Sequence, residues 1–189
     1  LKSLDGIAVS GGPGSFTGLR IGSATAKGLA LSLNLPILNV KTLEGMAMNF
    51  YGSHEIICPM LDARRTEVFT GIYTFRGSSP SLEVLSDQEA LPLSALAEKL
   101  SCMSKEMGKG VILLGDGARI YREKLEETLH CPHFYAPGSL NDQRASSVAS
   151  RGIEMFRAGL TESAAAHRPI YLRVSQAERV RAEKEKKNA

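Results

Sequence analysis

The sequence predicts an α/β fold made of two units. Strand-like apolar runs alternate along the chain with runs that have helical periodicity. A strand, a glycine-rich turn and a helix are expected near residues 7–20 and again near residues 111–125. Between these two regions, short strand-like runs separated by turns indicate an antiparallel meander.

The first predicted unit is residues 1–52. A short apolar run at 7–10 is typical of a buried strand, and a glycine-rich turn leads from it into a helix at 16–33. Glycine inside a helix costs roughly 1 kcal/mol relative to alanine, so the interior glycines predict close packing of this helix on a sheet. These glycines are Gly18, Gly22 and Gly28. The remaining expected elements are a strand at 37–40, parallel to the first, and a short helix at 43–50.

The second predicted unit is residues 53–168. Its helix at 92–105 has an apolar face at helical spacing. The basic segment 169–189 is expected to continue as a charged helix from about residue 176 and to return to the first unit. The other elements expected in the second unit are strands at 56–61, 67–75, 82–85, 111–114 and 134–135 and helices at 120–129 and 145–158.

The composition fits a folded protein, since 43% of the 189 residues are apolar and 23% are charged. A net charge of +3 is too small to predict a strongly cationic nucleic-acid surface. The positive charge is concentrated near the end, with seven Lys and Arg against three Glu in residues 168–187. Neither a signal peptide nor a membrane-length apolar run is visible, so we expect a cytoplasmic protein without membrane contact. The three cysteines form no C-x-x-C pair, and we expect reduced thiols.

The glycine-rich turn is the first candidate site. Backbone N–H groups of such a turn converge before a helix, and the helix dipole adds about half a positive charge there. The pattern matches neither G-x-G-x-x-G nor G-x-x-x-x-G-K-[ST], so a tight turn with ordinary helix capping is the alternative. The candidate residues for binding a nucleotide or another anion are Gly12, Gly14, Ser15, Thr17, Gly18 and Arg20.

Two further motifs carry charged side chains. Gly115-Asp116-Gly117 follows a predicted strand, and Asp116 there suits a ribose, a metal or only the start of a helix. Asp62, Arg64 and Arg65 lie at a predicted turn between strands. Because arginine suits bidentate contact with carboxylates and phosphates, this turn predicts either a partner surface or an internal Asp–Arg bridge. His130-Cys131-Pro132-His133 is better explained as a solvated loop than as a metal site.

The string from Gly12 to Ala30, G-P-G-S-F-T-G-L-R-I-G-S-A-T-A-K-G-L-A, closely resembles the TsaB (YeaZ) family. D-A-R-R-x-E-V-F at 62–69, G-D-G at 115–117 and P-I-Y-L-R at 169–173 resemble it too, in the order of the family. The resemblance implies an actin-like (ASKHA) ATPase-type fold of two α/β subdomains. It also implies a subunit of the bacterial complex that forms threonylcarbamoyladenosine in tRNA.

The same resemblance implies partners: a TsaD-type catalytic subunit, a TsaE-type ATPase, a second copy when the chain is alone, and tRNA only through the complex. Catalytic relatives continue the shared frame as V-N-H-x-E-G/A-H, whose two histidines on one helix face bind a metal. Here Thr42 and Met46 occupy these positions, and neither is a good ligand for iron or zinc. We therefore predict no metal, no catalytic residue and no required cofactor, with at most weak binding of ATP or ADP. The chain would be an inactive homologue of proteins once labelled metal-dependent proteases.

The family normally opens with a strand hairpin that carries an Asp-Thr-Ser turn. No such segment precedes residue 7 in this sequence, so we expect the first subdomain to lack its N-terminal strands here, by truncation. Two other functions compete with the scaffold role. One is an active actin-like kinase or ATPase that uses Asp5, Asp62 or Asp116 near Mg²⁺. The other is tRNA binding by the basic end of the chain, where Tyr171 is the one aromatic residue available for stacking.

Overall fold

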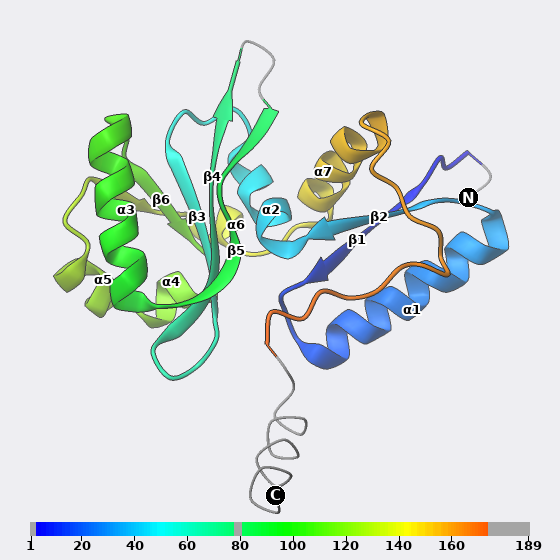
Figure 1. The fold of residues 1–189 in the computed structure, drawn as a ribbon, viewed down its shortest axis with the longest axis horizontal. Coiled ribbons are helices and arrows are strands. Elements are labelled where there is room, and N and C mark those ends of the chain that lie inside the picture. Colours follow the sequence, from blue (N-terminus) through cyan, green and yellow to red (C-terminus); the bar gives the residue numbers. More distant parts are fainter. Residues whose placement is uncertain (1–2, 78–80, 174–189) are drawn as a thin grey trace, which may run out of the picture.

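The computed structural model describes residues 3–77 and 81–173, which form two α/β lobes side by side (Figure 1). The first lobe has a two-stranded sheet of β1 and β2, and the second has a five-stranded sheet in the order β5-β4-β3-β6-β7. The predicted α/β class is therefore confirmed. The helix predicted from about residue 176 lies outside the described residues.

The first lobe is built from β1 (Ile7–Gly12), α1 (Phe16–Leu33) and β2 (Ile37–Lys41). The two strands are parallel, as predicted. α1 covers one face of this sheet, and α7 (Ala145–Arg157) covers the other (Figure 1). α7 lies so close to β1 that a Cβ at Gly152 would be 2.7 Å from the Cβ of Ala8, which explains the glycine. The predicted second unit included α7, whereas its packing places this helix in the first lobe.

The sequence predicted that all three glycines of α1 pack closely on the sheet, but Gly22 alone among them does so. Gly22 faces the sheet, where a Cβ would be 3.9 Å from Val9. An added Cβ would meet no neighbour at Gly28 and only Ser15 at Gly18. The prediction was wrong for these two because the helix is buried along a different stripe, whose members follow one another at i+4 or i+3 spacing. The buried residues of α1 are Leu19, Ser23, Ala26 and Ala30.

The second lobe begins with the predicted meander. β3 (Ile56–Asp62), β4 (Glu67–Arg76) and β5 (Ser81–Pro92) are antiparallel to one another. β6 (Val111–Leu114) and β7 (His133–Tyr135) extend the sheet from β3 as parallel strands. β5 is longer than the predicted strand at 82–85. The helices of this lobe are α3 (Leu93–Met107), α4 (Asp116–Ile120), α5 (Arg122–Thr128) and α6 (Gly138–Asn141).

The predicted helix at 120–129 corresponds to α5, and Tyr121, with φ −103° and ψ 19°, separates α5 from α4. Neither α4, which begins at Asp116, nor α6 was predicted as a helix, and each is short, with five and four residues.

The two lobes share one apolar core at α2 (Thr42–Ala47) and the following 3₁₀ turn η1 (Met48–Phe50). All residues of α2 are buried. Leu43 and Met46 of this helix pack with side chains from β3, β4 and β6 of the second lobe. We call α2 with these contacts the joint. The buried second-lobe residues in it are Ile57, Tyr73, Phe75 and Leu114.

Candidate functional site

Three segments that are far apart in the sequence meet where β1 ends, and a fourth, the G-D-G motif, joins them through the loop between β3 and β4. The backbone N–H of Ile170 donates to the carbonyl of Gly11 at 2.6 Å, so the segment 169–173 runs along the start of the glycine-rich turn. Three residues further on, Arg173 donates to the carbonyl of Ala63 at 2.7 Å and forms an ion pair with Glu67. This segment therefore links the turn before α1 to the loop between β3 and β4.

The glycine-rich turn is explained first by packing. Gly12 has φ 127°, and a Cβ at this position would overlap the carbonyl oxygen of Ile170. Ser15 caps α1, since the N–H of Gly18 donates to its Oγ at 3.3 Å. Thr17 is exposed. Of the two readings of this motif, ordinary capping is thus present, and anion binding stays a prediction.

A cavity of about 310 Å³ lies beside the start of α1. Arg20 stacks on the Phe16 ring, with its guanidinium carbon 3.9 Å from the ring centroid, and its Nε lies 3.4 Å from the hydroxyl of Tyr171. Phe69 of β4 and Arg173 line the cavity from the second lobe and the 169–173 segment. Residues from three of the segments that resemble the family, 12–30, 62–69 and 169–173, therefore line this one cavity.

The G-D-G motif meets the loop between β3 and β4. Asp116 accepts the backbone N–H of Asp62 at 3.0 Å. Gly115 has φ 97°, and a Cβ there would overlap the carbonyl oxygen of Met60, while one at Gly117 would be 3.1 Å from the Met60 carbonyl carbon. The two glycines thus allow α4 to pack against β3, which accounts for them without a ligand. Asp116 braces the neighbouring loop and does not cap its own helix.

Asp62 organises its loop through hydrogen bonds and forms no bridge to either neighbouring guanidinium. Its Oδ1 accepts the N–H of Arg64 at 2.8 Å and the hydroxyl of Tyr121 at 2.7 Å. Burial, followed by the bond to Asp62, raises the pKa of Tyr121. Among the residues that the structure describes, no acidic side chain pairs with Arg64 or Arg65, and both are exposed. The predicted internal Asp–Arg bridge was wrong.

The tip of this loop is strained. Arg64, Arg65 and Thr66 have φ of 63°, 56° and 61°, a conformation that costs roughly 1–2 kcal/mol per non-glycine residue. Backbone hydrogen bonds hold it, from Glu67 N to Arg64 O and from Leu93 N to Thr66 O, both at 3.1 Å. The surrounding structure therefore keeps the two arginines at a fixed, solvent-facing tip. No glycine or asparagine lies at this tip, so its left-handed conformation could not be predicted from the sequence.

The positions of the two absent histidines are occupied by packed side chains. Thr42 is 1% exposed, its hydroxyl lies 2.8 Å from Ser10 Oγ, and it accepts the N–H of Gly12 at 3.2 Å. Met46 is also 1% exposed and belongs to the joint, where a Cβ at Gly115 would be 3.1 Å from its methyl group. No group of three or more His, Cys, Asp or Glu suited to a metal ion occurs within residues 3–77 and 81–173.

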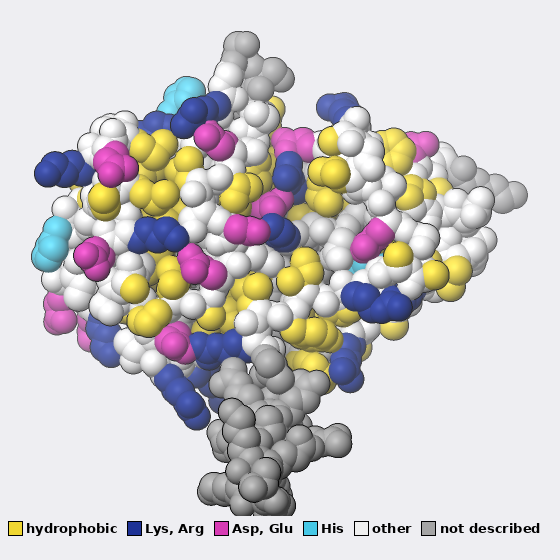
Figure 2. Space-filling view, in the orientation of Figure 1, with side chains coloured by type: hydrophobic (Ala, Val, Ile, Leu, Met, Phe, Trp, Pro, Cys, Tyr) yellow, Lys and Arg dark blue, Asp and Glu magenta, His cyan; other side chains and the backbone are white. Residues whose placement is uncertain are grey.

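Glu44, the acidic residue between these two positions, is paired with basic side chains. Glu44 accepts from Arg151 Nε at 2.8 Å and lies 3.7 Å from Lys41 Nζ. Arg151 also donates to Glu154 at 2.8 Å. Burial lowers the pKa of Arg151, but the carboxylates of Glu44 and Glu154 together raise it above its ordinary value. Lys41 also pairs with Asp87 of β5 at 2.6 Å, so charged side chains meet between the two lobes, as Figure 2 shows. Sequence reasoning missed this network because its members are far apart in the chain.

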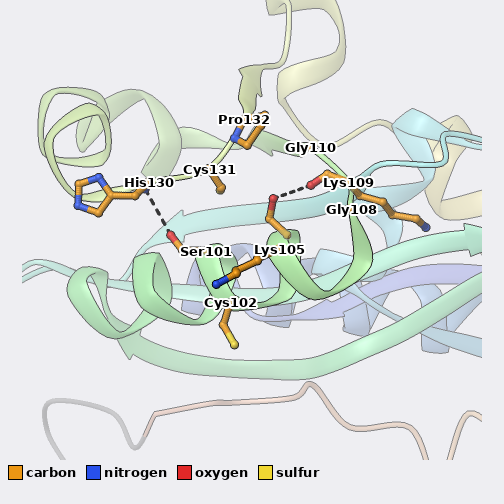
Figure 3. Close-up of a pocket in the computed structure, with 10 residues that line it drawn as sticks. Ser101, Cys102, Lys105, Gly108, Lys109, Gly110, His130, Cys131 and Pro132 are labelled. Carbon is orange, nitrogen blue, oxygen red and sulfur yellow. Dashed lines mark hydrogen bonds between the residues drawn. The ribbon is translucent and has the colours of Figure 1, made fainter.

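A larger cavity, about 590 Å³, lies in the second lobe between α3 and the loop before β7 (Figure 3). The N–H of His130 donates to Ser101 Oγ at 3.3 Å on its rim. The His130–His133 region is used internally, since His133 Nδ1 lies 2.8 Å from the carbonyl of Cys131. None of the four converging segments contributes to this cavity.

Comparisons with known proteins place the chain among tRNA-modification proteins. Residues 1–179 match the family described as TsaD, tRNA N6-adenosine threonylcarbamoyltransferase. The tRNA threonylcarbamoyladenosine biosynthesis protein TsaB of Bacillus subtilis is 36% identical over 94% of this chain and 73% of that protein. The protein with the same description from Escherichia coli is 28% identical over 92% of this chain and 72% of its own length.

Solved structures give the same relationship. YeaZ from Pseudomonas aeruginosa superposes with a TM-score of 0.70 and 27% identity, over 90% of this chain and 75% of that one. The predicted actin-like fold and the predicted relationship are therefore confirmed. Within the described parts of the chain, none of the helices has the length and apolarity needed to cross a bilayer.

Proposed function

Since the chain belongs to the TsaB (YeaZ) family, within the wider TsaD family of tRNA N6-adenosine threonylcarbamoyltransferases, we propose that it is a non-catalytic subunit that binds and activates a TsaD-type catalytic subunit. Its TsaB relatives act in the biosynthesis of threonylcarbamoyladenosine in tRNA. The observation that carries the proposal is the state of α2, the helix on which catalytic relatives would present metal-binding histidines.

At both positions the side chain is committed to the fold. The hydroxyl of Thr42 is hydrogen-bonded to Ser10 and Gly12 of β1, and the thioether of Met46 is buried in the joint. Glu44, the remaining acid of this turn, is paired with Arg151 and Lys41. A helix arranged in this way supports a structural role, because no side chain on it is free to bind a metal or to take a proton.

The outward face of α1 supports the partner role. Arg20 and Lys27 are the charged residues of this helix, and both are engaged, Arg20 on Phe16 and Lys27 with the carbonyl of His167 at 3.2 Å. The other exposed residues of this face are uncharged, and most have apolar or small side chains. Its exposed residues include Thr17, Gly18, Ile21, Ala24, Thr25, Gly28, Leu29 and Leu31. Ile21 and Leu31 are 63% and 69% exposed, an arrangement suited to docking a second helix.

Reconstitution tests the proposal. The TsaD-type and TsaE-type subunits, ATP, threonylcarbamoyl-AMP and tRNA are assayed for modified adenosine with and without this chain. We expect no product from this chain alone and product when it joins the others. Full activity without it would contradict the proposal. Steady ATP hydrolysis or phosphoryl transfer by the isolated chain would instead favour the kinase alternative, for which Asp62 and Asp116 are poorly placed because both brace the loop.

A variant separates partner binding from folding. Ile21→Glu places a charge in the centre of the uncharged face of α1, and we expect it to abolish co-purification with the TsaD-type subunit. Thr128→Glu, on the exposed surface of α5, is the matched control and is expected to co-purify normally. Equal urea midpoints for the two variants establish that the difference is not one of folding. Homodimerisation and weak ATP or ADP binding stay predictions that the same preparations can test.

A further inference from the structure

The cavity beside α1 combines exposed aromatic rings with cations. Phe16 and Tyr171 are 45% and 44% exposed, and their ring centroids are 5.4 Å apart with the planes tilted by 39°. Phe69 closes the hollow from β4. Aromatic rings that stay partly in water beside an apolar cavity of about 310 Å³ leave a surface on which a flat ring can stack. The tyrosine near the basic end is therefore joined by aromatic rings from elsewhere in the chain.

Cations border this hollow on two sides. Arg20 is held over Phe16 on the α1 side. On the other side, Arg173, which lines the cavity, bonds to Ala63 and Glu67, so the loop that carries Arg64 and Arg65 adjoins this side. In Figure 2, Lys and Arg side chains gather along the lower edge of this face, where Figure 1 shows the loop between β3 and β4 and the start of α1.

The acidic groups around the tip are already used. Asp62 accepts from Arg64 N and Tyr121, Asp116 accepts from Asp62 N, and Glu67 pairs with Arg173. Within residues 3–77 and 81–173, no acidic side chain pairs with the guanidinium groups of the tip, which suits them to an external anion. Arginine forks suit phosphate oxygens, and the strained backbone fixes both forks before a ligand arrives.

We propose that this cavity and the Arg64–Arg65 tip form a binding site for single-stranded RNA, in which an unpaired base stacks on the exposed aromatic surface of the Phe16–Tyr171 pair and flanking phosphates contact Arg20 and the tip. The proposal rests on the proposed function, because that function makes a tRNA loop the RNA concerned. Cations on both sides of the hollow suit a strand that continues past the base in both directions. An acidic protein segment would not account for the aromatic pair, and a free nucleotide would leave the cations on one side of the cavity without a phosphate to contact.

The test measures RNA affinity of the full chain bound to its TsaD-type partner, by fluorescence anisotropy with an anticodon stem-loop and with a duplex lacking the loop. Tyr171→Ala removes the stacking ring, and Tyr171→Phe keeps it. Arg64→Asn with Arg65→Asn removes both charges, and asparagine tolerates the left-handed backbone of the tip. Arg76→Gln, at the opposite end of β4, is the control for loss of charge.

We expect Tyr171→Ala to weaken stem-loop binding roughly 5- to 150-fold and Tyr171→Phe to leave it unchanged. The double arginine variant should weaken binding and reduce the slope of log affinity against log salt by about 1.4, since each lost phosphate contact on single strands contributes about 0.7. Arg76→Gln should resemble the wild type. The duplex should bind more weakly than the stem-loop and be indifferent to Tyr171→Ala.

Each other outcome overturns the inference. Unchanged stem-loop affinity in the variants excludes the site. Loss of co-purification with the TsaD-type subunit in the double arginine variant would assign the surface to that protein partner. Full displacement of the stem-loop by ATP would assign it to a free nucleotide. Partner co-purification and tRNA modification by the wild type are recorded in parallel, so that failure of the proposed function is seen separately from failure of this site.

Discussion

Thr42 provides the sharpest test of how the joint is held. Thr42→Val keeps the shape of the side chain and removes its hydroxyl. The N–H of Gly12, whose backbone is buried, then loses its acceptor at 3.2 Å, and Ser10 Oγ loses its partner at 2.8 Å. An orphaned buried N–H costs about 1–3 kcal/mol. The Ser10 hydroxyl lies in a half-buried strand and contributes about 0.5–1.5 kcal/mol.

We therefore expect Thr42→Val to lower the free energy of unfolding by about 2–4 kcal/mol, measured by urea denaturation with far-UV circular dichroism. Thr25→Val is the matched control, because the Thr25 hydroxyl is exposed and bonds only to the Ile21 carbonyl of its own helix. Its expected change is within about 0.5 kcal/mol. If both variants have the same stability, position 42 is not held by its hydrogen bonds, and the reasoning that it is committed to the fold fails.

The other predictions concern glycine, charge and pH. Gly12→Ala should lose about 2–4 kcal/mol of stability, because φ is 127° and a Cβ would overlap a carbonyl oxygen. Gly28→Ala should gain about 1 kcal/mol of stability, because this position is helical and an added Cβ would meet no neighbour. Thermal unfolding of the two variants checks both predictions. Glu44→Gln should lose about 1–2 kcal/mol of stability in urea, because Arg151, which is 18% exposed, loses one of its two carboxylate partners and keeps only Glu154 among the described residues. Glu44→Asp is the control that keeps the charge. Burial raises the pKa of Cys58 from 9.0 to about 12, so the folded chain keeps a proton that the unfolded chain releases. Stability should fall as pH rises above about 9, and the urea midpoint should fall less steeply with pH in Cys58→Ala; an identical slope would contradict this.

Much of the fold was visible in the sequence because local patterns determine it. The helix at 16–33 has a capping serine at its start and Asn34, in the left-handed conformation, at its end, and its observed bounds match the prediction. The parallel pair β1–β2 and the meander followed from short apolar runs and turns. α4 was not predicted because the glycines at 115 and 117 indicate a turn, and the start of this helix depends on packing against β3.

The site was less predictable, since it depends on long-range contacts. The sequence indicated each of the four segments but gave no sign that Tyr171 would lie against Phe16 or that Arg173 would reach Ala63. It left open whether Asp62 would pair with an arginine, and the deciding partner, Tyr121, is 59 residues away. The role of the glycines in α1 was mispredicted because a propensity argument does not tell which face of a helix is buried.

The joint has a consequence for how this protein can be taken apart. Tyr73 and Phe75 lie on a strand of one lobe, yet α2 of the other lobe keeps both out of water. A fragment that begins after Tyr51 would expose these rings, and a fragment that ends before it would leave α2 without its cover. The lobes are therefore expected to melt in a single transition, and dissection at the connecting turn should yield insoluble pieces instead of two working halves.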